Sequence, residues 1–146
     1  MNMDSKEYID VYTDGACSGN PGKGGWGVYI EIEGKIETIS GSESETTNNR
    51  MELVAVIRAL EYFDKGKKLN LFTDSKYVMD GINSWILKWK SNNWKTSKKE
   101  SVKNRDLWER LDELKELHTI SWRWVKGHEG NYGNEQADYL ATSAIK

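Results

Sequence analysis

Two short segments of the sequence end in the same way, with Thr-Asp followed by a small residue. Residues 8–19 read YIDVYTDGACSG and residues 69–76 read LNLFTDSK. In each segment a run of high β-propensity stops at an aspartate, Asp14 or Asp74. If the runs form neighbouring parallel strands, both carboxylates reach the crevice beyond the strand ends, where open α/β sheets bind ligands. The pattern therefore predicts a shared carboxylate site.

An ordinary structural role competes with this interpretation. Asp before Gly or Ser commonly caps the turn or helix that follows, and either residue alone would be interpreted in that way. Because Asp14 and Asp74 end two matched strands, we favour the shared site.

Two further acidic residues lie where they could complete such a site. Glu52 falls in the first turns of a predicted helix, within NNRMEL, where a solvated surface glutamate is the ordinary alternative. Asp138 lies in GNEQADYLA between Ala137 and Leu140, on the apolar side of another predicted helix. Burying an unpaired carboxylate is costly, so Asp138 in particular indicates a partner.

Clustered carboxylates repel one another and raise each other's pKa values, so the group requires a cation. Oxygen ligands without His or Cys favour Mg²⁺ or Mn²⁺ over Zn²⁺. One or two such ions suit in-line displacement at phosphorus, in which an attacking water and a leaving oxygen both need charge stabilisation. The expected reaction class is phosphodiester hydrolysis.

The elements that must position these acids follow from apolar periodicity and turn signals. Strands that alternate with helices predict a mixed α/β sheet, in which the first long helix crosses over between parallel neighbours. We expect strands at about 8–13, 26–33, 36–41, 69–73 and 119–125, and helices at about 47–63, 76–90, 104–117 and 133–144.

Length and composition predict a single domain. A chain of 146 residues can bury a real core, and its single cysteine, Cys17, cannot form an internal disulfide. The first ten residues, MNMDSKEYID, contain no apolar signal segment, and no stretch approaches the roughly 18 apolar residues of a membrane span. We expect a cytoplasmic, monomeric protein whose first residue is the mature start.

Charge is distributed unevenly along the chain, although the net charge is only −2. Residues 84–105 hold seven of the 21 basic residues and one of the 23 acidic residues. This segment therefore has a net charge of +6, and the rest of the chain has a net charge of −8. Trp85 and Trp89 share a helix face within it, and Trp94 follows. Core aromatics beside a solvated basic face are the alternative, but the charge indicates a phosphate-rich partner.

Five motifs, in this order and spacing, closely resemble those of the bacterial type 1 ribonuclease H family. They are YTDGACSGNPGKGGWG, TTNNRMELVAVIRALE, FTDSKYVMDGI, NRDLWERLD and WVKGHEGNYGNEQADYLA. The resemblance spans about residues 8–143. It implies a ribonuclease H-like fold, with strands 1–3 antiparallel, strands 4 and 5 parallel to strand 1, and helices on both faces. It also implies Mg²⁺-dependent cleavage of the RNA strand of RNA–DNA hybrids, which leaves 5′-phosphate and 3′-hydroxyl ends.

The same resemblance assigns the site residues. Asp14, Glu52, Asp74 and Asp138 match the family's four metal-binding acids, and His128 matches its loop histidine. A histidine in a glycine-rich loop close to the site could shuttle protons or help to release product. His118 matches no motif, and we expect it at the surface or at a helix end.

Substrate contacts are expected on both sides of these acids. The segment 84–105 resembles the family's basic protrusion, which holds the DNA strand through charge and aromatic packing. Recognition of RNA requires groups that sense 2′-hydroxyls near the metal site. In the family a Thr and an Asn hold a DNA phosphate, and they match Thr47 and Asn104. The other expected contacts are Gly15, Ala16, Cys17, Asn20, Asn48, Asn49 and Lys76 on the RNA side, and Trp85, Trp89, Lys90, Trp94 and Lys95 in the protrusion.

Two positions depart from the family pattern. Glu45 stands where many members carry Arg, which predicts a weaker pocket for the DNA phosphate. Lys76 stands where relatives commonly carry Gln, and it adds a positive charge near the metal site that partly compensates.

Three other functions fit parts of the pattern. A transposase or resolvase core of the same fold shares the strand-end acids, but the tryptophan-bearing basic segment and the His128 loop argue against it. A non-catalytic hybrid-binding module would gain nothing from four clustered acids beside phosphates. A glycosidase with paired carboxylates would not need a net charge of +6 in one segment.

Overall fold

Five strands form one mixed sheet in the computed structural model, which describes residues 8–127 and 130–145. The strands are β1 (Tyr8–Gly19), β2 (Gly22–Ile32), β3 (Lys35–Thr46), β4 (Lys68–Thr73) and β5 (Thr119–Trp124). The helical segments are α2 (Asn48–Tyr62), α3 (Lys76–Asp80), the π-helical turn η1 (Gly81–Trp85), α4 (Ile86–Ser91), α5 (Arg105–Lys115) and α6 (Tyr132–Ala144). No helix in the described part of the chain is long and apolar enough to cross a membrane.

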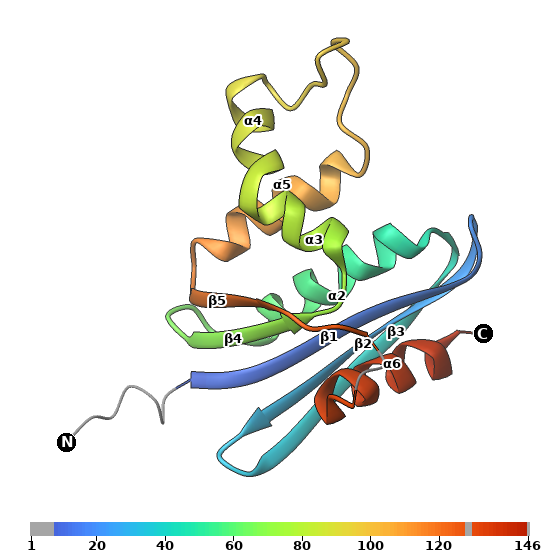
Figure 1. Cartoon of the computed structure of the whole chain (residues 1–146), viewed down its shortest axis with the longest axis vertical. Helices are drawn as coiled ribbons and strands as arrows, with labels where there is room; N and C mark the ends of the chain where they lie inside the picture. The colour runs from blue at the N-terminus through green and yellow to red at the C-terminus, as the bar shows by residue number, and fades with distance from the viewer. Residues whose placement is uncertain (1–7, 128–129, 146) are drawn as a thin grey trace.

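The strand order is β3-β2-β1-β4-β5. β2 runs antiparallel to β1 and β3, whereas β4 runs parallel to β1 and β5 runs parallel to β4. Figure 1 shows α2 behind the sheet and α6 in front of it, with α3, α4 and the following loop projecting beyond the sheet. This arrangement confirms the predicted α/β fold class and topology.

The core lies between the sheet and α2. Val11 and Leu71 are fully buried on one sheet face, and Leu53 and Leu60 meet them from the helix. The helix predicted from about residue 47 begins at Asn48. Thr47 is its N-cap, and the Thr47 Oγ1 accepts a hydrogen bond from the Arg50 amide at 3.2 Å.

Three strands are longer than predicted. β1 continues to Gly19, β2 begins at Gly22 and β3 continues to Thr46. The added residues are mainly Gly, Ser, Ala and Glu, which have low β-propensity. Pairing decides their conformation, since Gly15 faces Trp26 and Gly19 faces Gly22 across the β1–β2 ladder.

The helix predicted at 76–90 is interrupted by a π-helical turn, η1, between α3 and α4. Gly81, which begins this turn, lies against the ring of the fully buried Trp108. A Cβ at position 81 would lie 2.0 Å from the Trp108 Cη2. Only glycine allows this approach, which joins the projecting helices to α5.

His118 is buried, so the predicted surface position is wrong; the alternative, a position at a helix end, is confirmed, because the residue follows α5 and contacts the end of α2. Its Nδ1 accepts a hydrogen bond from the Lys67 amide at 3.2 Å, and its Nε2 lies 3.3 Å from the Leu60 carbonyl oxygen. These contacts fix the tautomer that carries its proton on Nε2. The ring satisfies backbone groups at the end of α2 and before β4, and such groups are costly to bury unpaired.

Candidate active site

The register of β1 and β4 sets two aspartates side by side. Thr13 and Thr73 face each other in the parallel ladder, and both are fully buried. The Thr13 hydroxyl donates to the Phe72 carbonyl oxygen at 3.4 Å, and the Thr73 hydroxyl accepts from the Ser75 amide at 3.0 Å. The following residues, Asp14 and Asp74, therefore lie just beyond the last pair of the β1–β4 ladder. Asp74 follows the end of β4 as predicted, whereas Asp14 lies within β1, which continues to Gly19 because it stays paired with β2.

Glu52 joins this pair from helix α2. The helix backbone lies so close to β1 that a Cβ on Gly15 would lie 2.5 Å from the Glu52 nitrogen and from the Met51 carbonyl carbon. Gly15 also donates its amide to the Asp14 Oδ1 at 2.9 Å. The absence of a side chain at Gly15 thus brings Glu52 close to Asp14, and the Gly15 amide orients the Asp14 carboxylate.

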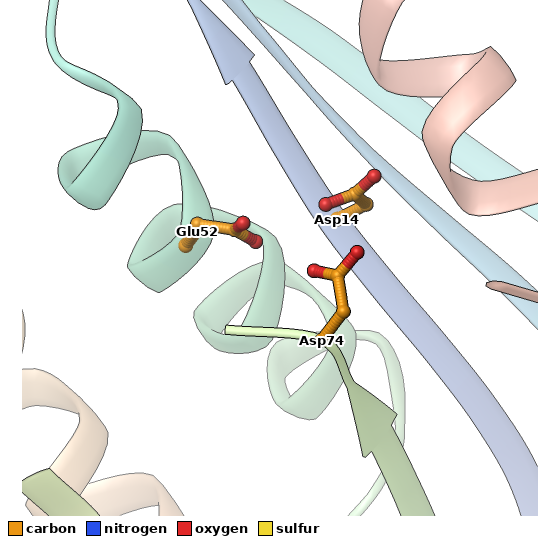
Figure 2. A group of neighbouring side chains, drawn as sticks. All are labelled: Asp14, Glu52 and Asp74. Carbon is orange, nitrogen blue, oxygen red and sulfur yellow. The ribbon is translucent and has the colours of Figure 1, made fainter. Parts of the chain in front are cut away.

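Asp14, Glu52 and Asp74 form a compact cluster. One carboxylate oxygen from each lies within 4.8 Å of those of the other two. Figure 2 shows the three side chains converging from β1, α2 and the end of β4. Asp14 is 4% exposed and Glu52 is 6% exposed, whereas Asp74 is half-buried.

Burial and mutual repulsion keep protons on this cluster when no cation is present. Burial, followed by the negative charge of Asp74, raises the pKa of Asp14 to about 8. Burial and the charges of Asp14 and Asp74 also raise the pKa of Glu52 well above its usual range. Within the described part of the chain, the buried Oε1 of Glu52 has no hydrogen-bond partner. The cluster is therefore suited to a positively charged ligand.

Asp138 approaches from the other face of the sheet. It is half-buried in α6, whose N-cap Asn131 accepts a hydrogen bond from the Asn134 amide at 2.9 Å. A hydrogen bond to Asp138 and its charge add to the rise in the pKa of Asp14, so the two carboxyl groups are neighbours. His128, the fifth expected catalytic residue, lies outside the described residues.

One contact to the cluster has no counterpart in the sequence analysis. The Trp124 indole Nε1 donates to the Asp74 carbonyl oxygen at 3.2 Å, and the Lys76 Nζ lies 5.5 Å from the centroid of the Trp124 ring. Trp124 thus fixes the backbone of Asp74. Its ring also attracts the ammonium group of Lys76. Its signal in the sequence is its place near the end of the fifth predicted strand, and in the structure it pairs with Thr73, the residue before Asp74.

The residues expected on the RNA side surround the start of α2. Ala16 and Cys17 are half-buried on β1, and the Cys17 thiol donates to the Thr46 carbonyl oxygen at 3.4 Å. The Asn20 Oδ1 accepts from the Asn48 amide at 3.1 Å, which links the β1–β2 turn to the helix. Asn20, Asn48, Asn49 and Glu45 are exposed.

The protrusion is built on a tryptophan cluster. The ring centroids of Trp85 and Trp89 lie 5.8 Å apart, those of Trp89 and Trp94 6.2 Å, and those of Trp89 and the buried Trp108 5.4 Å. All three expected contact tryptophans are half-buried, so each both supports the protrusion and keeps a surface for ligands.

The basic residues of the protrusion differ in their partners. Lys95 is exposed, as are Lys88, Lys98 and Lys99. Lys90 forms an ion pair with Asp112, with 3.2 Å between the Nζ and the Oδ2. Lys90 therefore offers less of its charge to a substrate than its neighbours do.

Asn104 is fixed by a tyrosine that the sequence analysis did not single out. The Tyr77 hydroxyl accepts hydrogen bonds from the Asn104 Nδ2 and the Trp108 Nε1, both at 3.1 Å. Asn104 itself has left-handed backbone angles, with φ at 58°. Thr47 and Asn104, the two expected DNA-phosphate residues, thus lie at the N-caps of α2 and α5.

Comparison with known proteins agrees with this geometry. The profile of the RNase H family matches residues 6–146. The chain belongs to the RNase H family. Ribonuclease H of Francisella philomiragia subsp. philomiragia is 53% identical over 140 residues, which is 96% of this chain and 92% of that protein.

Two solved structures place the chain within the RNase H family in three dimensions. LC9-RNase H1, a type 1 RNase H with the type 2 active-site motif, superposes with a TM-score of 0.85 at 35% identity, covering 95% of this chain and 72% of that chain. LC11-RNase H1, solved in complex with an RNA/DNA hybrid, superposes with a TM-score of 0.70 at 26% identity, covering 94% of this chain and 96% of that chain.

Proposed function

We propose that this protein is an endoribonuclease that hydrolyses the RNA strand of RNA–DNA hybrids. It uses Mg²⁺, for which Mn²⁺ can substitute, and leaves 5′-phosphate and 3′-hydroxyl ends. Residues 1–146 form one catalytic domain, which acts as a monomer in the cytoplasm. The observation that carries the proposal is the cluster of the buried Asp14 and Glu52 with the half-buried Asp74, just beyond the last pair of the parallel β1–β4 ladder.

The donor set fits a hard divalent cation. All three groups are carboxylates, which Mg²⁺ and Mn²⁺ prefer, and no His or Cys among residues 8–127 and 130–145 belongs to the cluster. The unpartnered Oε1 of Glu52 is a buried acceptor that a cation would satisfy. Asp138, beside Asp14, is the fourth ligand that we assign. When bound, such ions supply the positive charge that phosphodiester hydrolysis needs at the attacking and leaving oxygens.

The chain's own residues then bind and orient the hybrid. Gly15 and Trp124 hold Asp14 and Asp74 in place through hydrogen bonds to a carboxylate oxygen and a backbone carbonyl oxygen. Asn20, Asn48 and Asn49 lie exposed near the start of α2, where amide groups can reach the 2′-hydroxyls of RNA. We assign the RNA side to them together with Gly15, Ala16, Cys17 and Lys76.

The DNA strand is assigned to the protrusion and to the two N-caps. Thr47 and Asn104 hold a phosphate, and the half-buried tryptophans pack against sugars. Exposed lysines such as Lys95 contribute charge without reading bases, so we expect little sequence preference. LC11-RNase H1, a family member solved with an RNA/DNA hybrid, supports this choice of substrate. The protrusion residues assigned are Trp85, Trp89, Lys90, Trp94 and Lys95.

A gel assay with four labelled substrates tests the proposal. The substrates are an RNA–DNA hybrid, single-stranded RNA, duplex RNA and duplex DNA, each incubated with Mg²⁺ and with EDTA. We expect cleavage of the RNA in the hybrid alone, and only with Mg²⁺. Equal cleavage of duplex DNA, or cleavage that persists in EDTA, would refute the proposal.

An Asp74→Asn variant separates catalysis from binding. It should abolish turnover and reduce the rise in melting temperature that Mg²⁺ causes, while hybrid binding stays measurable. Asp64→Asn, which makes the same change at an exposed position, is the matched control and should retain both turnover and the Mg²⁺ effect. If Asp74→Asn behaved like Asp64→Asn, the carboxylate cluster would not be the catalytic site.

A further inference from the structure

A second pocket lies on the sheet face that carries α6, one step along the strands from the carboxylate cluster. It is open to solvent and has a volume of about 340 Å³, and Tyr12, Tyr29, Glu31, Tyr132 and Gly133 contribute to its lining. Tyr12 and Asp14 are two residues apart on β1, so both side chains point to the same face, about 7 Å apart along the strand. Nothing in the proposed reaction uses this pocket.

Three tyrosines form its walls. Tyr12 and Tyr29 face each other across the β1–β2 ladder, with ring centroids 6.2 Å apart and planes inclined at 59°. The ring of Tyr132, at the start of α6, meets Tyr29 edge-on at 6.0 Å and 78°. A third ring contact supports Tyr12. The ring of Phe72 stacks on that of Tyr12, with centroids 4.5 Å apart and planes inclined at 12°. The rings thus enclose the pocket from different directions.

Gly133 brings the tyrosine of α6 into this arrangement. A Cβ at position 133 would lie 2.4 Å from the Tyr12 Cε1, so only glycine lets the first turn of α6 contact the Tyr12 ring. This contact places Tyr132 over the pocket with 64% of its surface exposed. A large aromatic side chain left this exposed beside two others is available to a ligand.

One carboxylate, that of Glu31, lines the pocket, and a second, that of Asp10, lies beside it. Asp10 and Glu31 face each other directly in the β1–β2 ladder, next to the facing pair of Tyr12 and Tyr29. Like charges in facing positions destabilise a sheet unless a cation lies near them. Asp10 accepts a hydrogen bond from the Asn70 Nδ2 at 3.0 Å, a neutral donor that leaves the net charge of the two carboxylates unchanged.

Two positive groups nearby do not cancel this charge. Arg123 directs its Nε to the Asn70 Oδ1, at 3.3 Å, rather than to a carboxylate of the pair. The N-terminus of α6 contributes about half an elementary charge, which Glu135 in its first turn opposes. The negative charges of Asp10, Glu31 and Glu135 together exceed the positive charges of Arg123 and the helix N-terminus, so the local field favours a cation.

We propose that this pocket binds a small organic ammonium ion of the polyamine class. Aromatic faces attract weakly hydrated alkylammonium groups, and a neighbouring carboxylate adds charge complementarity. Strongly hydrated Mg²⁺ gains little from such walls and prefers the carboxylate cluster. A volume of about 340 Å³ lies at the lower end of the range for small-molecule sites, which favours a free amine over a protein surface.

Binding can be measured without the hybrid, so the outcome is independent of the proposed nuclease activity. The protein, labelled with ¹³C on its tyrosine rings, is titrated in constant Mg²⁺ with spermidine, with tetramethylammonium and with KCl at matched ionic strength. We expect saturable NMR shifts at Tyr12, Tyr29 and Tyr132 with both organic cations but not with K⁺.

Four variants locate the site. Tyr132→Ala and Glu31→Gln should each weaken spermidine binding by about threefold or more. Tyr139→Ala removes another exposed tyrosine of α6, and Glu33→Gln removes a neighbouring charge; both should bind as the parent protein does. Melting temperatures close to that of the parent protein would show that Tyr132→Ala and Glu31→Gln remain folded.

Three outcomes would overturn the proposal. The first is that KCl shifts the tyrosine NMR signals as much as spermidine does. The second is that the folded Tyr132→Ala variant binds spermidine with the affinity of the parent protein. The third is that the protein binds a lysine-containing peptide but not spermidine.

Discussion

Asp14 and Asp74 lie side by side because the residues before them, Thr13 and Thr73, are directly opposed in the β1–β4 ladder. Glu52 then enters from α2, and one oxygen from each of the three groups falls within 4.8 Å of the others. Buried like charges at this separation destabilise the fold unless they are protonated or bound to a cation. Repulsion within the cluster thus lowers the stability of the folded protein, and the same carboxylates serve ligand binding.

The raised pKa of Asp14 predicts a pH-dependent penalty in the metal-free protein. Below about pH 4 the carboxyl is neutral in both folded and unfolded chains, so it costs nothing. Between about pH 4 and 8 the unfolded chain ionises, whereas the folded chain keeps the proton. The free energy of unfolding must therefore fall as pH rises through this window.

Asp14→Asn removes that penalty. In EDTA we expect it to raise the free energy of unfolding by on the order of 2 kcal/mol at pH 8, and to change it little at pH 4. Urea unfolding of the parent and variant proteins at both pH values measures the difference. A variant equally stable to the parent at pH 8, or stabilised equally at both pH values, would contradict this prediction.

Gly15→Ala tests the close approach of α2 to β1. The added Cβ would lie 2.5 Å from backbone atoms of Met51 and Glu52, so the helix must move. We expect a loss of about 3 kcal/mol in the free energy of unfolding and a large loss of turnover, because Glu52 moves with the helix.

Gly34→Ala provides the comparison for this variant. A Cβ there meets no atom within 4 Å, and only the left-handed backbone, with φ at 81°, opposes it. Its cost should be about 1 kcal/mol, with turnover retained. If Gly15→Ala cost no more than Gly34→Ala, the contact with α2 would not be close.

The exposed lysines of the protrusion should set the salt dependence of hybrid binding. Replacing Lys88, Lys95, Lys98 and Lys99 with Gln removes up to four phosphate contacts. We expect weaker binding and a plot of log affinity against log salt that is less steep by about 3. Lys90 is kept, because its loss would leave Asp112 without this ion pair.

Lys35→Gln with Lys65→Gln is the control for this experiment, since both lysines are exposed outside residues 84–105. It should leave the slope unchanged. An unchanged slope in the four-lysine variant would mean that the basic segment is only a solvated face.

His128→Ala should lower turnover by on the order of 10- to 100-fold while the Mg²⁺-induced rise in melting temperature remains. The expected reason is the loss of a group that moves protons or releases product. Single-turnover and steady-state rates on the hybrid distinguish these two roles. Parent-like turnover would show that His128 has no such role.

His118→Ala is the matched histidine variant. It leaves the Lys67 amide and the Leu60 carbonyl group without their partner, so it should lower the free energy of unfolding by about 2 kcal/mol. The specific activity of the folded fraction should not change.

Much of the fold follows from local patterns. Alternating and apolar runs predicted all five strands, and the helix expected from about residue 47 begins at Asn48. The patterns underestimated the lengths of β1, β2 and β3, because glycine- and serine-rich segments adopt strand conformation only when they pair with a neighbouring strand. His118 shows the same limit, because a motif search does not indicate which backbone groups a side chain will satisfy after folding.

The sequence by itself determined the identity of the acidic residues, the segregation of charge into residues 84–105 and the resemblance to a family. These are properties of residue types and order, which sequence spacing displays directly. Only the tertiary structure decided that oxygens of the buried Asp14 and Glu52 and of the half-buried Asp74 lie within 4.8 Å of one another, that Trp124 holds Asp74, and that Lys90 is paired with Asp112. The reason is physical: a pKa, a hydrogen bond and an available charge depend on distance and burial, which the packing of β1, β4 and α2 sets.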